Sequence, residues 1–197
     1  MAGHTAKDPT APPDELRSAA RRAIRVLTVT VSDSRTAGSD ESGERLRALL
    51  ESAGFSLAPH RLVADEPELV RGIVRELTEG DLADALVTTG GTGIAPRDQT
   101  YEALEPLLEK RLDGFGEAFR RLSWDEVGPR SVLSRAVAGV VAGRFVVALP
   151  GSPRAVTLAV EQLVIPLLEH AVALCRGQAG QHRHGTEPPG GHGGGAG

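Results

Sequence analysis

The chain has 197 residues, 40% of them apolar and 24% charged, with a net charge of −4 at pH 7. These values are typical of one soluble globular domain with tails. The acidic balance argues against a duplex-binding protein, and the single cysteine excludes an intramolecular disulfide. The sequence has neither an apolar run of about 18 residues nor an apolar segment at its start, so we predict a cytoplasmic protein that binds neither nucleic acid nor membrane.

The two ends of the chain differ in composition from its middle. Residues 1–22 are predicted to form a disordered N-terminal tail, because the first 13 contain three prolines and few core-forming side chains. Residues 177–197, which include nine Gly and three His, predict a disordered Gly/His-rich tail with incidental histidines. The remaining residues, 23–176, are predicted to form a single domain.

Segments with strand and helix patterns alternate along that domain. The first half contains a buried strand at residues 25–32, a helix at 42–53, a strand at 55–64, an amphipathic helix at 67–79, a buried strand at 83–89 and a helix at 99–110. The second half contains a short helix at 115–124, two β-rich runs at 136–142 and 144–149 split by Gly143, and an apolar helix at 154–175 that Pro166 kinks or splits. This alternation predicts fold class α/β, a mostly parallel central sheet with helices on both faces.

Polar clusters follow the predicted strands. They occupy residues 32–35 and 40–43, then 65–66, then 90–93 with 97–98, and finally 150–154. Ligands of open α/β sheets bind outside the carboxyl ends of the strands. We therefore expect four loops to converge on one pocket.

The Gly90-Gly91-Thr92-Gly93 string lies at a predicted turn from strand to helix. Glycines there let the backbone approach an anion and direct N–H groups at it. The string lacks the spacing of a Walker A loop or of a dinucleotide fingerprint. Two interpretations stay open, a tight packing turn and a phosphate cradle, and the nearby Arg97 and Asp98 favour the cradle.

Asp65 and Asp98 follow neighbouring predicted strands, and Asp33 is a third candidate carboxylate. Mg²⁺ takes one or two carboxylates together with substrate phosphates. The alternative is that Asp65 and Asp98 cap the helices that follow them, which is compatible with a role in catalysis.

Arg35, Arg97 and Arg154 each lie in one of these loops, which suits a polyanionic substrate, although solvated surface arginines are the alternative. Neither His60 nor His170 lies in a glycine loop, and Cys175 fits a packing role, so a hydrolytic triad is disfavoured. No His/Cys set has zinc spacing. The residues favour phosphoryl or nucleotidyl transfer by positioning and metal electrostatics.

Five strings resemble the MogA/MoaB family of molybdenum-cofactor biosynthesis, which includes the G domain of gephyrin. In order, they are VSDSRTAGSDESG, TTGGTGIAPRDQTYEAL, DGFGE, LSRAVAG and LPGSPRAV, and the resemblance covers residues 24–176. It implies an α/β fold that assembles as a homotrimer, in some members a hexamer. It also implies transfer of AMP from Mg-ATP to molybdopterin with release of pyrophosphate, and a partner enzyme that inserts molybdate into the product.

The resemblance implies that Asp65 and Asp98 are catalytic and bind Mg²⁺. Together with Arg97, the predicted nucleotide- or pterin-binding residues are Ser32, Asp33, Ser34, Asp40, Ser42, Gly43, Gly90, Gly91, Thr92, Gly93, Ser134, Arg135, Pro150, Gly151, Ser152 and Pro153. Ser152 replaces the amide residue that relatives often have in this loop. That replacement removes the side-chain contact that an amide could make to the base.

Two further functions stay open beside the adenylyltransferase. One is a non-catalytic MoaB-like protein that binds molybdopterin or serves as a scaffold. The other is a hydrolase of the competence-damage type that acts on a nicotinamide nucleotide. Retention of both Asp65 and Asp98 favours the adenylyltransferase.

Overall fold

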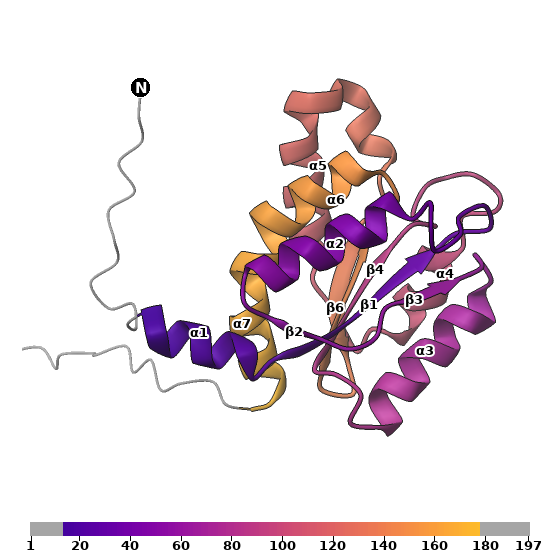
Figure 1. Cartoon of the computed structure of the whole chain (residues 1–197). Coiled ribbons are helices and arrows are strands. Elements are labelled where there is room, and N and C mark those ends of the chain that lie inside the picture. Colours follow the sequence, from indigo (N-terminus) through magenta and orange to yellow (C-terminus); the bar gives the residue numbers. More distant parts are fainter. Residues whose placement is uncertain (1–13, 178–197) are drawn as a thin grey trace, which may run out of the picture.

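A seven-stranded sheet forms the centre of the computed structural model, which describes residues 14–177 (Figure 1). The strands along the sheet follow the order β2-β1-β4-β7-β6-β5, and β3 pairs with β1 beyond the end of β2. Their bounds are β1 Arg25–Val31, β2 Ser56–Leu57, β3 Arg61–Val63, β4 Ala85–Thr89, β5 Lys110–Arg111, β6 Val137–Val141 and β7 Arg144–Leu149.

The central strands β1, β4 and β7 run parallel, with Val26 opposite Ala85 and Ala85 opposite Phe145. The other edge is antiparallel, because β6 and β7 form a hairpin and β5 pairs antiparallel with β6. Ala142 and Gly143 form the hairpin turn with φ of 45° and 72°. Positive φ at both positions fits the twist of a two-residue hairpin.

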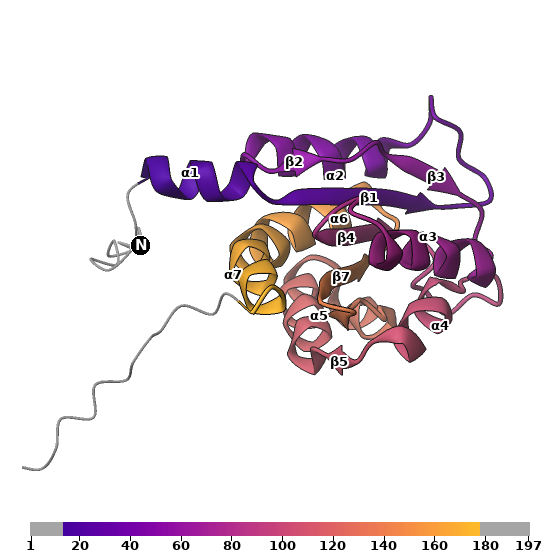
Figure 2. The same cartoon turned by 90° about the horizontal axis from the view of Figure 1, so that it is seen from below.

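Helices cover both faces of the sheet, as predicted (Figures 1 and 2). The first face packs against α2 Glu41–Ser52, α5 Asp113–Val127, α6 Pro153–Ala159, the π-helix η3 Val160–Val164 and α7 Ile165–Cys175. The second face packs against α3 Pro67–Glu79 and α4 Thr100–Leu104. Two short 3₁₀ helices are η1 Glu105–Leu107 and η2 Gly128–Leu133.

Strand alternation divides the core into two layers. Along β1, Val26 belongs to the first layer, whereas Leu27 and Val29 belong to the second. Successive side chains of a strand point to opposite faces, so a strand buried on both sides reads as an unbroken apolar run. The first face also receives Thr28 and Thr30, which are fully buried polar side chains.

Three predicted elements differ from the structure. The strand predicted at 55–64 is divided into β2 and β3, with Pro59 in the interruption. Proline cannot donate to a sheet ladder, which accounts for the break. The helix predicted at 99–110 ends at Leu104, because Pro106 begins a 3₁₀ turn before β5. The helix predicted at 115–124 is longer, since α5 spans Asp113–Val127.

The predicted N-terminal tail also needs a correction, because α1 spans Asp14–Arg22. Arg21 attaches it to the domain by donating from Nη1 to the carbonyl of Ala53 at 3.1 Å, and it lies 3.5 Å from Glu169. Figures 1 and 2 show α1 beside α7. Residues 1–13 and 178–197, with the three tail histidines, lie outside the described residues.

The segment Pro153–Cys175 is long and apolar enough to cross a membrane by length and composition alone. One side of it packs against the sheet, where Val156, Val164 and Leu168 are fully buried. Pro166 interrupts it as predicted, because the backbone forms a π turn just before the proline that cannot donate.

Candidate functional site

The carboxyl ends of β1, β4 and β7 meet at one edge of the sheet, where their loops enclose a cavity of about 200 Å³. We call it the edge cavity; Figure 1 shows one of its loops, the loop after β1, at the upper right. The loops of four sequence clusters contribute to it. Its lining residues are Val31, Ser32, Asp33, Ser34, Arg35, Asp65, Gly90, Gly91, Arg97, Asp98 and Gly151.

Two glycines let the loop after β4 pack against its neighbours. Gly90 has φ of 101°, and an added Cβ would lie 2.1 Å from the Val31 carbonyl oxygen. Gly91 has φ of 64°, and its Cβ would lie 2.6 Å from Asp65 Oδ2. Side chains are excluded at both positions by backbone conformation and by space.

The same loop also offers donors. Within residues 14–177, the backbone N–H groups of Gly91, Thr92 and Gly93 donate to no acceptor. Gly90 differs, because its N–H bonds the Leu149 carbonyl at 3.0 Å. One loop therefore combines the tight packing turn at Gly90 with backbone donors from Gly91 onward that are available to an anion.

Asp33, Asp65 and Asp98 gather at the edge cavity. Asp33 Oδ1 accepts from the Asp65 N–H at 2.9 Å, and Asp65 Oδ1 accepts from the Gln99 N–H at 3.0 Å. Asp98 Oδ2 accepts from the Ala95 N–H at 2.8 Å. Within the described chain, the second oxygen of Asp65 and of Asp98 accepts no hydrogen bond.

Helix capping does not explain Asp65 and Asp98. The N-cap of α3 is Glu66 and the N-cap of α4 is Gln99, and neither helix has a side-chain cap. Asp65 instead joins the loop after β3 to the loop after β4 by accepting from the Gln99 N–H, whereas Asp98 accepts from the Ala95 N–H within the loop after β4. The capping alternative is wrong for both residues.

Burial raises the pKa of Asp65, and the neighbouring carboxylates of Asp98 and Asp33 raise it further. The Gln99 N–H and the Arg97 guanidinium oppose the shift but do not cancel it. An ionised carboxylate in such surroundings is stabilised by a cation.

The donor set fits Mg²⁺ but not a cage made only of protein groups. No group of three or more His, Cys, Asp or Glu is arranged for a metal within residues 14–177. Two carboxylates beside a phosphate-binding loop match the usual Mg²⁺ arrangement, in which substrate phosphates supply further ligands.

The three loop arginines have different surroundings. Arg35 Nη2 donates to the Gly151 carbonyl at 2.7 Å, and its Nη1 lies 3.3 Å from Asp40 Oδ1. Arg97 is exposed at the edge cavity and has no ion-pair partner in the described part of the chain. Arg154 is 84% exposed and lies outside the edge cavity, 3.9 Å from Glu126. The arginine available to a polyanion is therefore Arg97.

Asp40, Ser42 and Gly43 are buried behind the edge cavity. Asp40 is the N-cap of α2 and accepts from the Gly43 N–H at 3.0 Å. Ser42 Oγ donates to the Gly151 carbonyl at 2.7 Å. The structure thus places these residues where they join the loop after β1 to the loop after β7, without exposing them to the cavity.

Within the loop after β7, Gly151 alone lines the edge cavity. Pro150 and Ser152 line a neighbouring cavity of about 280 Å³ between α5 and α6. Ser152 Oγ accepts from the Ala155 N–H at 3.3 Å and caps α6, and Pro153 is the first residue of that helix. The hydroxyl at position 152 therefore has a structural partner.

Ser134 and Arg135 line a third cavity of about 550 Å³ beside α5. Arg135 Nη2 donates to the Gly93 carbonyl at 2.5 Å and its Nε to the Thr92 carbonyl at 3.4 Å. The guanidinium also pairs with Glu102 and lies 4.9 Å from the Tyr101 ring centroid. Arg135 thus supports the glycine-rich loop from the side away from the edge cavity.

Sequence reasoning missed two residues of this region, His60 and Gln99. His60 looked like an isolated core histidine, and only the pairing of β3 with β1 places it beside Asp40. Gln99 acts through its backbone N–H on Asp65, a contact without a side-chain pattern.

The fold and the edge cavity define a class, an α/β domain with a polar cavity at the carboxyl edge of its sheet. A family model described as "Probable molybdopterin binding domain" matches residues 27–170. The chain is 44% identical over 154 residues to "Molybdenum cofactor biosynthesis protein B" of Staphylococcus aureus (strain COL), covering 77% of this chain and 91% of that one.

Solved structures agree with the family model. A crystal structure of molybdenum cofactor biosynthesis protein B has a TM-score of 0.75 at 39% identity, covering 79% of this chain and 97% of that chain. The MoaB structure from Thermus thermophilus has a TM-score of 0.69 at 36% identity, covering 78% and 97%. The chain belongs to the MogA/MoaB family, and its role lies in molybdenum-cofactor biosynthesis. The resemblance inferred from the five strings is confirmed.

Proposed function

We propose that this chain is a molybdopterin adenylyltransferase, which transfers AMP from Mg-ATP to molybdopterin and releases pyrophosphate. One observation carries the proposal: Asp65, Asp98 and the glycine-rich loop border one cavity at the carboxyl edge of the sheet. Family membership supplies molybdopterin as the expected acceptor. In the reaction an acceptor oxygen of molybdopterin bonds to the α-phosphorus, while the bond from that phosphorus to the β-phosphate oxygen breaks.

Each part of the edge cavity has a role in this reaction. The Gly91 N–H in the cavity wall binds a phosphate oxygen, and the N–H groups of Thr92 and Gly93, which follow it in the loop outside the lining residues, extend this anion site. Arg97 neutralises the charge that passes to pyrophosphate. Asp65 and Asp98 would hold Mg²⁺, and each has one carboxylate oxygen that accepts no N–H within residues 14–177. Mg²⁺ supplies charge neutralisation on the phosphates when bound.

The experiment is pyrophosphate release from Mg-ATP by the purified chain, measured with and without molybdopterin. We expect release that depends on molybdopterin. Retained molybdopterin binding without release would indicate a non-catalytic MoaB-like protein instead. Absence of binding as well would favour another nucleotide-handling member of this fold.

Assembly, location and further partners stay predictions. The homotrimer or hexamer implied by the resemblance needs a subunit interface. Trp124, Val127, Val132 and Leu133, which are 48–63% exposed on α5 and η2, offer an apolar surface for it. Light scattering of the purified chain measures the mass of the assembly. Delivery of the product to a molybdate-inserting enzyme and a cytoplasmic location are tested by pull-down and by cell fractionation.

A further inference from the structure

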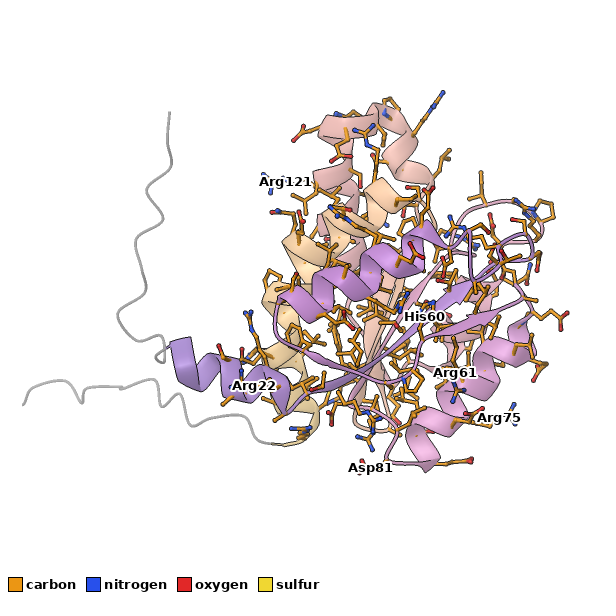
Figure 3. The ribbon with its side chains drawn as sticks, viewed as in Figure 1. Arg22, His60, Arg61, Arg75, Asp81 and Arg121 are labelled. Atoms are coloured by element: carbon orange, nitrogen blue, oxygen red, sulfur yellow. The ribbon has the colours of Figure 1, made fainter. Side chains whose placement is uncertain are left out.

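His60 lies below α2, between β2 and β3, and it is absent from the wall of the edge cavity (Figure 3). Its imidazole is well bonded. Nδ1 lies 2.9 Å from Thr28 Oγ1, and Nε2 lies 3.1 Å from Asp40 Oδ2. With the proton on Nε2, the ring donates to Asp40 and accepts from Thr28, so the neutral histidine satisfies both nitrogens.

Asp40 connects this histidine to the cavity wall. Its Oδ2 faces His60, while its Oδ1 accepts from Gly43 and lies 3.3 Å from Arg35 Nη1. Arg35 in turn donates to the Gly151 carbonyl at 2.7 Å. Arg35 and Gly151 both line the edge cavity, so a continuous set of contacts runs from His60 to two cavity groups.

The space around this set is closed. A Cβ added to Gly43 would lie 2.1 Å from Asp40 Oδ2 and 2.7 Å from His60 Nε2. Asp40 itself is only 4% exposed. A carboxylate buried this deeply needs its hydrogen bonds, and His60 is one of its donors beside Thr30 and the Gly43 N–H. Loss of the Nε2 donor therefore weakens the hold on the Asp40 carboxylate that pairs with Arg35.

We propose that His60 is a positioning residue, which holds Arg35 and the Gly151 loop at the cavity wall through Asp40. The expected effect of His60 on Mg-ATP affinity rests on the proposed function, whereas its expected effect on the reactivity of the Arg35 guanidinium does not. A histidine that serves only packing would affect stability without changing the reactivity of Arg35.

The test compares two variants that keep different parts of the imidazole. His60→Gln retains an N–H donor near the Nε2 position and can bond Asp40. His60→Asn retains polar atoms near the Nδ1 position only and can reach Thr28 but not Asp40. His170→Ala, which changes an exposed histidine of α7, serves as the control. Circular dichroism establishes the temperature at which all the chains are folded.

The first readout is the rate at which phenylglyoxal modifies Arg35, measured by mass spectrometry of the digested chain. Loss of one hydrogen bond corresponds to about a fivefold change in an equilibrium. We expect Arg35 to react about fivefold faster in His60→Asn, with His60→Gln and His170→Ala close to the parent chain. Arg97 is the internal reference, because it faces the same cavity without an ion pair among the described residues. Equal Arg35 rates in all the chains would overturn the inference.

The second readout is the dissociation constant of Mg-ATP, measured by calorimetry. It should rise about fivefold in His60→Asn and recover in His60→Gln. If the parent chain binds no Mg-ATP or releases no pyrophosphate, the proposed function fails and the Arg35 rates still decide the role of His60. If the modification rate of Arg35 changes in His60→Asn but the dissociation constant of Mg-ATP does not, His60 positions Arg35 without affecting substrate binding, and that part of the inference is wrong.

Discussion

Asp40, at the end of the loop after β1, and Asp65, in the loop after β3, are carboxylates with different surroundings. Burial alone would raise the pKa of Asp40, but hydrogen bonds from Thr30, the Gly43 N–H and His60 outweigh burial and lower it. At Asp65, burial and the other carboxylates raise the pKa, and one backbone N–H only partly compensates. A fully bonded carboxylate stabilises the fold, whereas a group of carboxylates without compensation is prepared for a cation.

The largest expected effect is on catalysis at Asp98. Asp98→Asn retains an oxygen that can accept the Ala95 N–H, so the loop should keep its shape. Loss of one electrostatic group should lower molybdopterin-dependent pyrophosphate release about a hundredfold, or about 2.7 kcal/mol of transition-state stabilisation.

The control for this experiment is Asp125→Asn, which changes an exposed carboxylate on α5. Its turnover should match that of the parent chain. Turnover of Asp98→Asn equal to that of the control would remove Asp98 from the catalytic residues.

The next effect concerns the stability of the glycine-rich loop. In Gly91→Ala, the new Cβ would lie 2.1 Å from Thr100 Oγ1, in a backbone conformation with φ of 64°. Strain and overpacking together should lower the free energy of unfolding by about 2–4 kcal/mol, measured by urea denaturation.

Gly72→Ala is the matched control, because nothing lies within 4 Å of a Cβ at this position in α3. It should raise the free energy of unfolding by about 1 kcal/mol, the helix-propensity gain of Ala over Gly. A positive φ alone costs about 1 kcal/mol. If Gly91→Ala lowers the free energy of unfolding by no more than this, the close packing of the loop is contradicted.

The third experiment replaces Asp65 and Asp40 in turn, and the two substitutions should change the free energy of unfolding in opposite directions. A pKa raised in the folded state means that the stabilisation is complete below the unfolded pKa and is lost as the pH rises through the folded pKa. At pH 7 the ionised Asp65 carboxylate is unfavourable in the folded state, and Asp65→Asn removes this charge. The substitution should therefore raise the free energy of unfolding by about 0.5–2 kcal/mol. Asp40→Asn should lower it by about 1.5–3 kcal/mol, the contribution of a hydrogen bond to a charged group.

Thermal unfolding at pH 7 without ligands measures both variants. Changes of the same sign would show that the two carboxylates do not differ in the way described.

The smallest effect is the pH dependence that His60 contributes. Burial lowers the pKa of His60 from 6.5, against the opposing attraction of Asp40, while the charge of Arg47 on α2 lowers it further. Below pH 6.5 the unfolded chain binds the extra proton more readily, so stability should fall as the pH decreases.

Urea denaturation at two pH values, one above and one below 6.5, measures this effect. His60→Gln, which does not titrate, should lose less stability than the parent chain on acidification. An equal loss in both chains would assign the dependence to other groups.

Much of the fold follows from local pattern. The helix predicted at 67–79 has the observed bounds, because its apolar spacing and initial proline are local features. The two β-rich runs predicted on either side of Gly143 are also observed, as β6 and β7 of one hairpin. Two of the errors arose where a proline interrupted an apolar run, at Pro59 and at Pro106. A short apolar run of this kind fits both a helix and a strand until its packing partner is known.

The candidate site was predictable in its location but not in its connections. The rule for parallel sheets brings Asp65 and Asp98 to one edge, as expected. It does not show that Asp40 is buried, nor that Arg135 supports the loop from behind. These roles depend on contacts between distant residues, which residue type and local spacing do not encode.

The most direct test follows the α-phosphate itself. ATP labelled at the α-phosphorus is mixed with molybdopterin, Mg²⁺ and excess chain, and the products are separated after one turnover. We predict that the label appears on molybdopterin with the parent chain and stays on ATP with Asp98→Asn. Label that stays on ATP with the parent chain, while molybdopterin is bound, would contradict adenylyl transfer and assign the edge cavity to binding alone.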